Sequence, residues 1–173
     1  MNLFVKHGLR FLLFVFVQVL VLNQIELGYG IQIMIYPLYI LLLPVDLAII
    51  PLMLIAFSTG LFIDVMSDTY GLHTSAMVAF AYARTLIFNL FAPRDGYDPL
   101  LETNVSNMGT GWFLKVFGLL LILHHFWFFM LEMFKLNEIG FVLRKTALSA
   151  PLSFLICILL QYLLLQKRAK NEI

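Results

Sequence analysis

The sequence is poor in charged residues and holds a single cysteine. Of its 173 residues 12% are charged, whereas a typical soluble domain has about 25%. So few charges cannot cover the surface of a folded domain in water, which excludes an ordinary soluble enzyme and a charge-rich disordered chain. Cys157 has no second cysteine to pair with, which excludes a disulfide scaffold. The 11 Lys and Arg residues are balanced by 10 Asp and Glu residues, so no basic excess points to a nucleic-acid partner.

Apolar residues dominate instead. They make up 62% of the chain, and the mean hydropathy is +0.95. Because a transmembrane helix needs about 17–25 mainly apolar residues, the apolar runs predict an all-α integral membrane protein. We expect one transmembrane domain over residues 1–173, a six-helix bundle in a lipid bilayer. The expected spans are residues 9–25, 31–43, 47–63, 74–91, 112–134 and 147–165.

The second and third of these spans come from one apolar stretch, Ile31–Ile63. A single helix over its 33 residues would be about 50 Å long, which is too long for one crossing. Pro44 lies near the middle, and a proline removes a hydrogen-bond donor and disfavours helix in the residue before it. We therefore expect two short spans, with a re-entrant hairpin over Ile31–Leu43 as the open alternative.

The positive charges predict the orientation of the bundle. Six spans place both termini on one side of the membrane. On that side, or towards it, lie eight of the 11 cations, Lys6, Arg10, Arg84, Arg94, Lys115, Lys167, Arg168 and Lys170. Since cytoplasmic segments carry the excess of Lys and Arg, we expect both termini in the cytoplasm. Asp64, Asp68 and His73 are then on the outer side.

Small side chains recur every four residues along the fourth expected span. Ser75, Ala79 and Ala83 share one face of a helix. Small residues let two helices approach closely in a membrane. We favour packing inside the bundle as the role of this face, and contact with a helix of a partner protein is the alternative.

Arg84 is a charged residue within the same span. A charge at the centre of a membrane helix costs about 2.5–3.5 kcal/mol on insertion scales, so the side chain needs a partner or a route to water. Two interpretations stay open. Arg84 reaches the cytoplasmic headgroups, or it pairs with Asp46 at the break after Pro44.

Two adjacent histidines, His124 and His125, lie near the middle of the fifth expected span, and Glu132 lies near its outer end. Adjacent residues point in different directions on a helix, so the pair is a poor zinc site. We favour hydrogen bonds between helices as their role and keep a proton relay as the alternative. The sequence has no catalytic triad, phosphate-binding loop or metal motif. We therefore expect no enzyme and no catalytic, cofactor-binding or metal-binding residues.

The third expected span ends at Asp64, and the connection that follows it is short. We expect the Asp64 carboxylate to accept hydrogen bonds from free amides at the start of the next helix, where a negative charge is stabilised. Gly71 suits a positive φ just before that start. A solvated Asp64 without a partner is the alternative.

Five short motifs are spread along the chain. They are Gly60-Leu61-Phe62-Ile63-Asp64, Tyr70-Gly71-Leu72-His73-Thr74-Ser75-Ala76, Pro93-Arg94-Asp95-Gly96-Tyr97, His124-His125 and the distal Glu132. Together they resemble the MreD family of rod shape-determining proteins, in the form found in Bacteroidetes-type bacteria. The resemblance covers nearly the whole chain. It implies a bundle similar to the substrate-binding subunits of energy-coupling-factor transporters.

The resemblance also implies a function and partners. It implies a non-catalytic component of the cell-elongation machinery in a bacterial inner membrane, which binds MreC and supports lateral peptidoglycan synthesis. Through MreC it implies links to MreB, RodA and a class B penicillin-binding transpeptidase. The likeness to transporter subunits supplies the alternative, a membrane subunit that binds a small vitamin-type solute. The structural or partner-binding candidates are Gly60, Asp64, Gly71, Ser75, Ala79, Ala83, Arg84, His124, His125 and Glu132.

Overall fold

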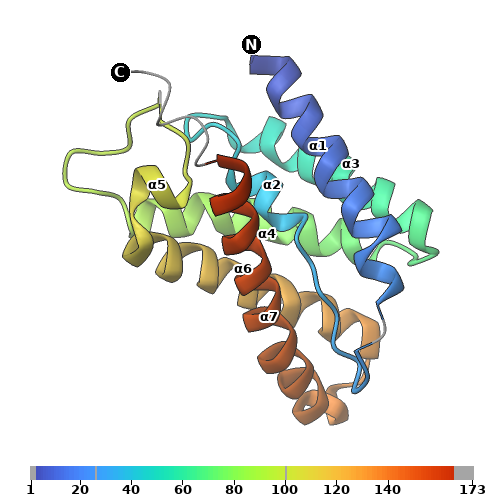
Figure 1. Cartoon of the computed structure of the whole chain (residues 1–173). Coiled ribbons are helices and arrows are strands. Elements are labelled where there is room, and N and C mark those ends of the chain that lie inside the picture. The colour runs from blue at the N-terminus through green and yellow to red at the C-terminus, as the bar shows by residue number, and fades with distance from the viewer. Residues whose placement is uncertain (1–2, 26, 100, 166–173) are drawn as a thin grey trace.

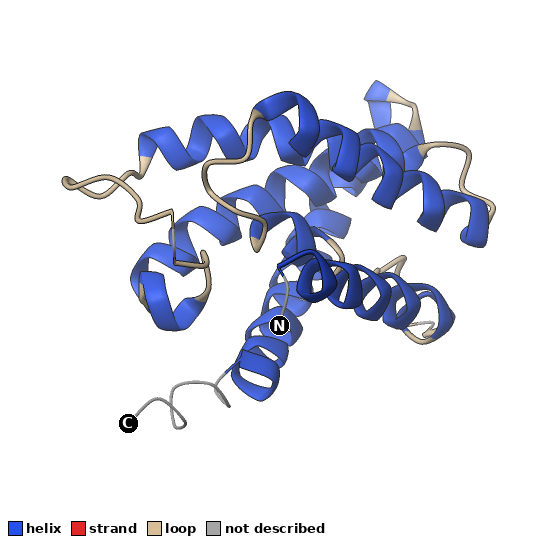
Figure 2. Ribbon diagram, turned by 90° about the horizontal axis from the view of Figure 1, so that it is seen from above, coloured by secondary structure: helices blue, strands red, loops and turns tan. Residues whose placement is uncertain are grey.

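The chain folds into helices joined mostly by short connections (Figure 1). The structure is a computed structural model that describes residues 3–25, 27–99 and 101–165, and these residues form helices and loops but no strand (Figure 2). The long helices are α1 (Leu3–Leu20), α3 (Ile49–Ser67), α4 (Leu72–Leu90), α6 (Thr110–Met133) and α7 (Ile139–Leu165). The short elements are α2 (Pro37–Leu41), α5 (Val105–Met108) and 3-10 helices at Leu22–Gln24 and Leu136–Glu138. The expected all-α fold is confirmed.

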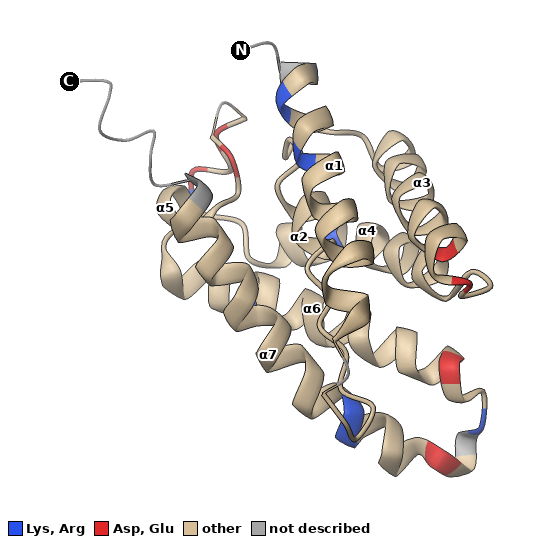
Figure 3. Ribbon diagram, turned by 45° about the vertical axis from the view of Figure 1, so that its right-hand side comes forward, with Lys and Arg blue, Asp and Glu red and all other residues tan. Residues whose placement is uncertain are grey.

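Four of the described helical segments are long and apolar enough to cross a membrane. They are Val5–Gln24, Ile49–Ser67, Thr110–Met133 and Ile139–Leu163. Only 22–44% of the most apolar window in each is buried inside the protein, so much of the apolar surface faces outward. The charged residues gather near the ends of the long helices and in the connections (Figure 3). This distribution is that of an all-α protein embedded in a bilayer.

Helix α4 lies between α3 and α6, while α1 packs against α3 and α7 packs against α6 (Figures 1 and 2). A short turn joins α3 to α4. Helix α4 is not among the four candidate spans, because it carries Arg84 and several small polar residues. Helix α4 is less apolar than its neighbours, and it is held in place by packing between α3 and α6, which are both strongly apolar.

The expected span over residues 31–43 is not a continuous helix. Residues 31–35 form no helix, and the helical part is confined to α2. Pro37 is the first residue of α2. It has no amide hydrogen, and its ring clashes with the carbonyl four residues earlier, so a helix cannot run through it from residue 31. All five residues of α2 are nevertheless buried among the long helices.

Side chains of α7 hydrogen-bond one edge of the segment 31–35. The backbone amide of Gln32 donates to the Ser149 hydroxyl oxygen at 3.1 Å, and the amide of Met34 donates to that of Ser153 at 2.9 Å. The two serines are four residues apart and therefore share a face of α7. The two amides are two residues apart and point the same way, as in a strand.

Gln18 of α1 hydrogen-bonds the other edge. Its side-chain oxygen accepts from the Ile35 amide at 2.9 Å, and its side-chain nitrogen donates to the Ile33 carbonyl at 2.8 Å. Unpaired backbone groups cost several kcal/mol each in a bilayer, so non-helical backbone is tolerated there only where the protein supplies partners. Gln18 and the two serines supply them, which explains how the segment lies buried without being a helix.

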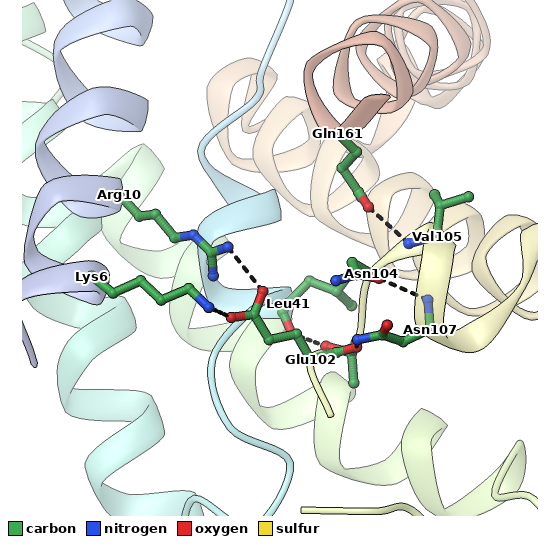
Figure 4. A network of polar contacts seen from close by, with 9 residues as sticks. Lys6, Arg10, Leu41, Glu102, Asn104, Val105, Asn107 and Gln161 are labelled. Atoms are coloured by element: carbon green, nitrogen blue, oxygen red, sulfur yellow. Dashed lines mark hydrogen bonds and ion pairs between the residues drawn. The ribbon is translucent and has the colours of Figure 1, made fainter. Parts of the chain in front are cut away.

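One end of the molecule is tied together by Glu102 in the loop after α4 (Figure 4). Its carboxylate forms ion pairs with Lys6 and Arg10 in the first turns of α1, the second at 2.9 Å. Lys6 and Arg10 lie within the first part of the apolar segment Val5–Gln24, so the ion pairs compensate charges at the beginning of this helix. They fix the beginning of α1 against the loop.

The same loop reaches α2 and α7. Thr103 donates its hydroxyl to the Leu41 carbonyl at 2.6 Å, and the Val105 amide donates to the Gln161 side-chain oxygen at 2.9 Å (Figure 4). The end of α2 and the last turns of α7 therefore lie at the same end of the molecule as the beginning of α1.

Candidate functional site

A groove runs along one face of α4, between walls formed by α3 and α6. Its volume is about 980 Å³ and its lining is almost entirely apolar. The residues that line it are Met53, Phe57 and Leu61 of α3, Gly71 before α4, Thr74, Ser75, Val78, Ala79, Phe80, Tyr82 and Ala83 of α4, and Leu123, His124, Phe126 and Trp127 of α6. The small residues Ser75, Ala79 and Ala83 all belong to this lining.

The groove exists because these α4 side chains are shorter than their neighbours. Phe57 on α3 and Trp127 on α6 are each 46% exposed and stand on either side of them. Ser75, Ala79 and Ala83 are half-buried, and Ala83 packs against the core. Packing inside the bundle therefore accounts for part of this face, and the groove leaves the rest open. No described residue of this chain fills the space over that open part.

His124 lies at the bottom of the groove. Of the lining residues only Phe80 and His124 are buried, each 1% exposed, so these two form the floor. Neither ring nitrogen of His124 has a hydrogen-bond partner among the described residues. Its neighbours are the rings of Tyr36, Phe80 and His125, at centroid distances of 5.2, 6.0 and 5.5 Å. A buried polar group without a partner costs about 1–3 kcal/mol, so this site calls for an explanation.

His125, the next residue, has partners on both ring nitrogens. Its Nδ1 lies 2.8 Å from the Leu121 carbonyl, and its Nε2 lies 3.1 Å from the Ser153 hydroxyl of α7. A carbonyl only accepts, so we assign the proton to Nδ1, and Nε2 accepts from Ser153. The expectation of hydrogen bonds between helices is confirmed for His125 and is wrong for His124 within this chain.

Glu132 is two turns of α6 away from His124 and belongs to a different environment. Its carboxylate forms an ion pair with Lys145 of α7 and accepts from the Gln32 side-chain nitrogen at 3.2 Å. His124 and Glu132 are eight residues apart and lie on the same side of α6, but they do not belong to one site.

A second cavity, of about 460 Å³, lies at the end of the molecule opposite Glu102. It opens between the end of α1, the segment before α2, the start of α4 and the end of α6. Its polar lining comes from Asn23, Gln32, Ser67, Thr69, His73 and Glu132. His73 is the deepest of these, 3% exposed, and its Nδ1 lies 2.7 Å from the Tyr36 hydroxyl.

The Asp64 carboxylate holds the start of α4. Its Oδ1 accepts from the His73 amide at 3.0 Å and from the Thr69 hydroxyl at 2.7 Å, while Oδ2 accepts from the amide and hydroxyl of Thr74 at 2.8 and 2.5 Å. Gly71 has φ +89° just before the helix. The expected hydrogen bonds of Asp64 and the expected conformation of Gly71 are confirmed. The alternative of a solvated Asp64 is wrong, since the residue is buried.

Gly60 marks the closest approach of α3 to α4. A Cβ atom on this residue would collide with the Thr74 Cα and would lie 2.7 Å from the His73 carbonyl oxygen. Both are backbone positions, which cannot move aside without shifting the helix. Gly60 therefore has a structural role, placing the start of α4 within reach of Asp64.

Arg84 follows neither of the two interpretations drawn from the sequence. The side chain is 2% exposed, so it does not reach the headgroups. Its Nη2 donates to the Leu43 and Pro44 carbonyls at 2.7 and 3.1 Å, and it forms no described ion pair with Asp46. Buried carbonyls of a non-helical segment need donors from elsewhere in the protein. Arg84 supplies one to the turn that follows α2.

Three residues that carry the buried segment escaped the sequence reasoning, namely Gln18, Ser149 and Ser153. The signal was present: Gln18 is the polar residue within a long apolar run, and the serines are spaced by four on the last helix. Their partners are backbone atoms of residues 31–35. Because this segment was expected to be helical, its backbone groups were expected to bond one another rather than these side chains.

The described residues contain no group of three His, Cys, Asp or Glu side chains that could hold a metal ion. Comparison of the chain with models of protein families, with curated proteins and with solved structures finds no match. The groove and the second cavity are the two features of the described residues that offer room for another molecule.

Proposed function

We propose that the protein is a non-catalytic component of the cell-elongation machinery of a bacterial inner membrane, and that its groove binds the transmembrane helix of an MreC-type partner. The observation that carries the proposal is the open, apolar groove of about 980 Å³ with small side chains along α4. The motifs that resemble the MreD family suggest which kind of single-span partner to test first.

The groove has the features that helix association in a membrane requires. Lipid tails are as apolar as leucine, so helices associate through close packing rather than through the hydrophobic effect. Ser75, Ala79 and Ala83 let a foreign backbone approach α4. The exposed Phe57 and Trp127 side chains offer contact area on its two sides.

The chain has almost no mass outside its apolar helices, so we propose that it acts by positioning its partner. An MreC-type protein bound in the groove would connect it indirectly to MreB, RodA and a class B penicillin-binding transpeptidase. In this proposal the chain performs no chemistry of its own.

The proposed topology has six passages through the membrane with both termini in the cytoplasm. The long helices supply five passages, and the segment 31–41, which runs from the Glu132 end to the Glu102 end of the bundle, supplies the sixth. Reporters that are active only outside the cytoplasm should be silent in residues 92–111 and after residue 173, and active near Asp68 and Glu138. The reverse pattern would contradict the orientation.

Partner binding can be tested by filling the groove. Ala79→Phe places a large ring in the groove, and we expect this variant to lose co-purification of the MreC-type protein encoded in the same genome. Ala147→Phe is the matched control, because Ala147 is exposed on α7 and lies outside the groove lining. Retention of the partner by Ala79→Phe, with unchanged thermal stability, would overturn the proposal.

The function itself can be tested in cells. Depletion of the protein should make cells round or wide, with less lateral wall synthesis. The Ala79→Phe variant should fail to restore cell shape, whereas the Ala147→Phe variant should restore it. Normal cell shape after full depletion would contradict the proposed role in cell elongation.

A second candidate function, a membrane subunit that binds a small solute, is favoured by the second cavity. At about 460 Å³ it has room for a small molecule, and it combines polar side chains with an aromatic floor at Phe128. Depleted cells that keep their shape but lose uptake of a vitamin-type solute would favour this function. The variant His73→Phe should then abolish solute binding without affecting the groove.

A further inference from the structure

Both ring nitrogens of His124 lack a hydrogen-bond partner within the described chain. A neutral imidazole presents one donor and one acceptor. The other buried imidazoles in the described chain have partners: both nitrogens of His125 are bonded, and His73 bonds Tyr36. His124 has aromatic rings on its inner sides and the groove in front of it. Both nitrogens are buried, and His124 lines the groove, so the groove is the side from which another molecule approaches this residue.

The depth of His124 restricts what that partner is. The residue lies about 21 Å along α6 from Thr110 and about 14 Å from Met133, at 1.5 Å per residue. This places it well inside the hydrocarbon region of a bilayer about 30 Å thick. The acyl chain of a lipid has no polar atom at this depth, and water is excluded from it. A side chain on a helix is the ordinary means of bringing a hydroxyl or amide there.

We infer that the groove receives a transmembrane helix of another protein, and that this helix carries a hydroxyl or carboxamide side chain which hydrogen-bonds His124. The inference rests on the proposed function and adds a chemical requirement to it. Close approach over Ala79 and Ala83 brings the foreign backbone near the floor, on which His124 lies.

A second copy of this chain is the poorer occupant. Two copies related by a two-fold axis through the groove would bring two concave faces together, and the space over Ser75, Ala79 and Ala83 would stay unfilled. A foreign helix is convex and fills it.

The test uses the full chain in detergent with its full-length single-span partner. His124→Leu should weaken partner binding by about 5–30-fold, the range expected for one hydrogen bond between membrane helices. The chain alone should be as stable as the wild type. Replacing the Ser, Thr, Asn or Gln residues in the middle third of the partner helix with Leu, one at a time, should identify one whose loss is not additive with His124→Leu. His124→Gln, which keeps a donor and an acceptor, should retain most of the affinity.

A spectroscopic signature gives a second readout. The ¹⁵N resonances of the His124 ring, assigned by their absence in His124→Leu, should shift on complex formation, while those of His125 should stay in place. A merely structural role of His124 would move neither set.

The failures of this inference and of the proposed function are distinguishable. Unchanged binding by His124→Leu, together with loss of binding by Ala79→Phe, would overturn the hydrogen bond and leave the helix in the groove. Unchanged binding by both variants would overturn the proposed function as well. A lipid that stays bound to the wild type in native mass spectrometry and is lost from Ala79→Phe would assign the groove to lipid. A homodimer lost in Ala79→Phe would assign it to a second copy. Either of the last two results overturns the inference.

Discussion

The buried segment 31–35 and the groove on α4 solve the problem of polar atoms in a membrane in opposite ways. The segment is irregular backbone, yet Gln18, Ser149 and Ser153 hydrogen-bond it from both sides. The groove is built from regular helices, yet it leaves both nitrogens of His124 without a partner. In the first region the chain completes its own hydrogen bonds and in the second it does not. The difference separates a part of the molecule whose polar atoms are satisfied within the chain from a part for which we propose a partner in another molecule.

The strongest way to break this comparison is to remove Gln18. Gln18→Leu leaves the Ile35 amide and the Ile33 carbonyl buried without partners, at about 1–3 kcal/mol for each. We expect the free energy of unfolding in mixed micelles to fall by about 3 kcal/mol. Gln24→Leu is the matched control, because Gln24 is exposed and bonds only its own helix region through the Val19 carbonyl. Equal stability of the two variants would show that the segment does not depend on Gln18.

Gly60→Ala tests the close contact between α3 and α4. The added Cβ meets the Thr74 and His73 backbone, so the helices must separate, and we expect a loss of about 2 kcal/mol. Gly118→Ala is the control within α6, where the nearest atom to the new Cβ is in the Phe154 ring at 3.9 Å. Thermal denaturation in detergent distinguishes them. A melting temperature of Gly60→Ala equal to that of Gly118→Ala would contradict the contact.

Asp64→Ala tests the hydrogen bonds in the turn between α3 and α4. The close contact at Gly60 places the start of α4 within reach of Asp64. The substitution removes three hydrogen bonds from the start of α4 and one from Thr69 in the turn, but water can replace some of them at this end of the bundle. We therefore expect a smaller loss, about 1.5 kcal/mol. Asp68→Ala, at an exposed residue of the same turn, should change the stability by much less. Negligible effects of both substitutions on the melting temperature would make the turn a mere linker.

The smallest effect on stability is expected for His124→Leu, and this variant tests directly whether His124 lacks a partner within the chain. His124→Leu removes a buried polar group that has no partner, so the stability of the isolated chain should stay within about 0.5 kcal/mol or rise. His125→Leu leaves the Ser153 hydroxyl without its acceptor and should lower the stability by about 1 kcal/mol. The two variants change adjacent residues of the same helix, so each is the control for the other. A larger loss for His124→Leu would show that this residue already has its partner within the chain.

Sequence reasoning reached the fold class and the turn, because both depend on neighbours in sequence. Long apolar runs predict helices wherever they fold, and Asp64 meets an amide only nine residues away. It failed where distant segments decide the structure. Whether residues 31–35 form a helix depends on Ser149 and Ser153, more than 100 residues later.

The same limit applies to the candidate site. The spacing of Ser75, Ala79 and Ala83 located the face correctly but did not show whether another part of the chain covers it. For Arg84, the sequence offered charged or aqueous partners, whereas the structure uses backbone carbonyls of the turn that follows α2. A sequence does not show which backbone groups the fold leaves unpaired, so it cannot identify them as hydrogen-bond partners.

The hydrogen bonds of the segment 31–35 also set an order for biosynthesis. The Gln32 and Ser149 positions are 117 residues apart, so at 5–20 residues per second the ribosome makes the acceptor about 6–23 s after the donor. During that interval the segment has no partner from α7 and cannot rest in the hydrocarbon at its final depth. It enters the bilayer only when the last helix does. In a nascent chain halted before residue 149, cysteines introduced one at a time at residues 31–35 should therefore react with water-soluble thiol reagents.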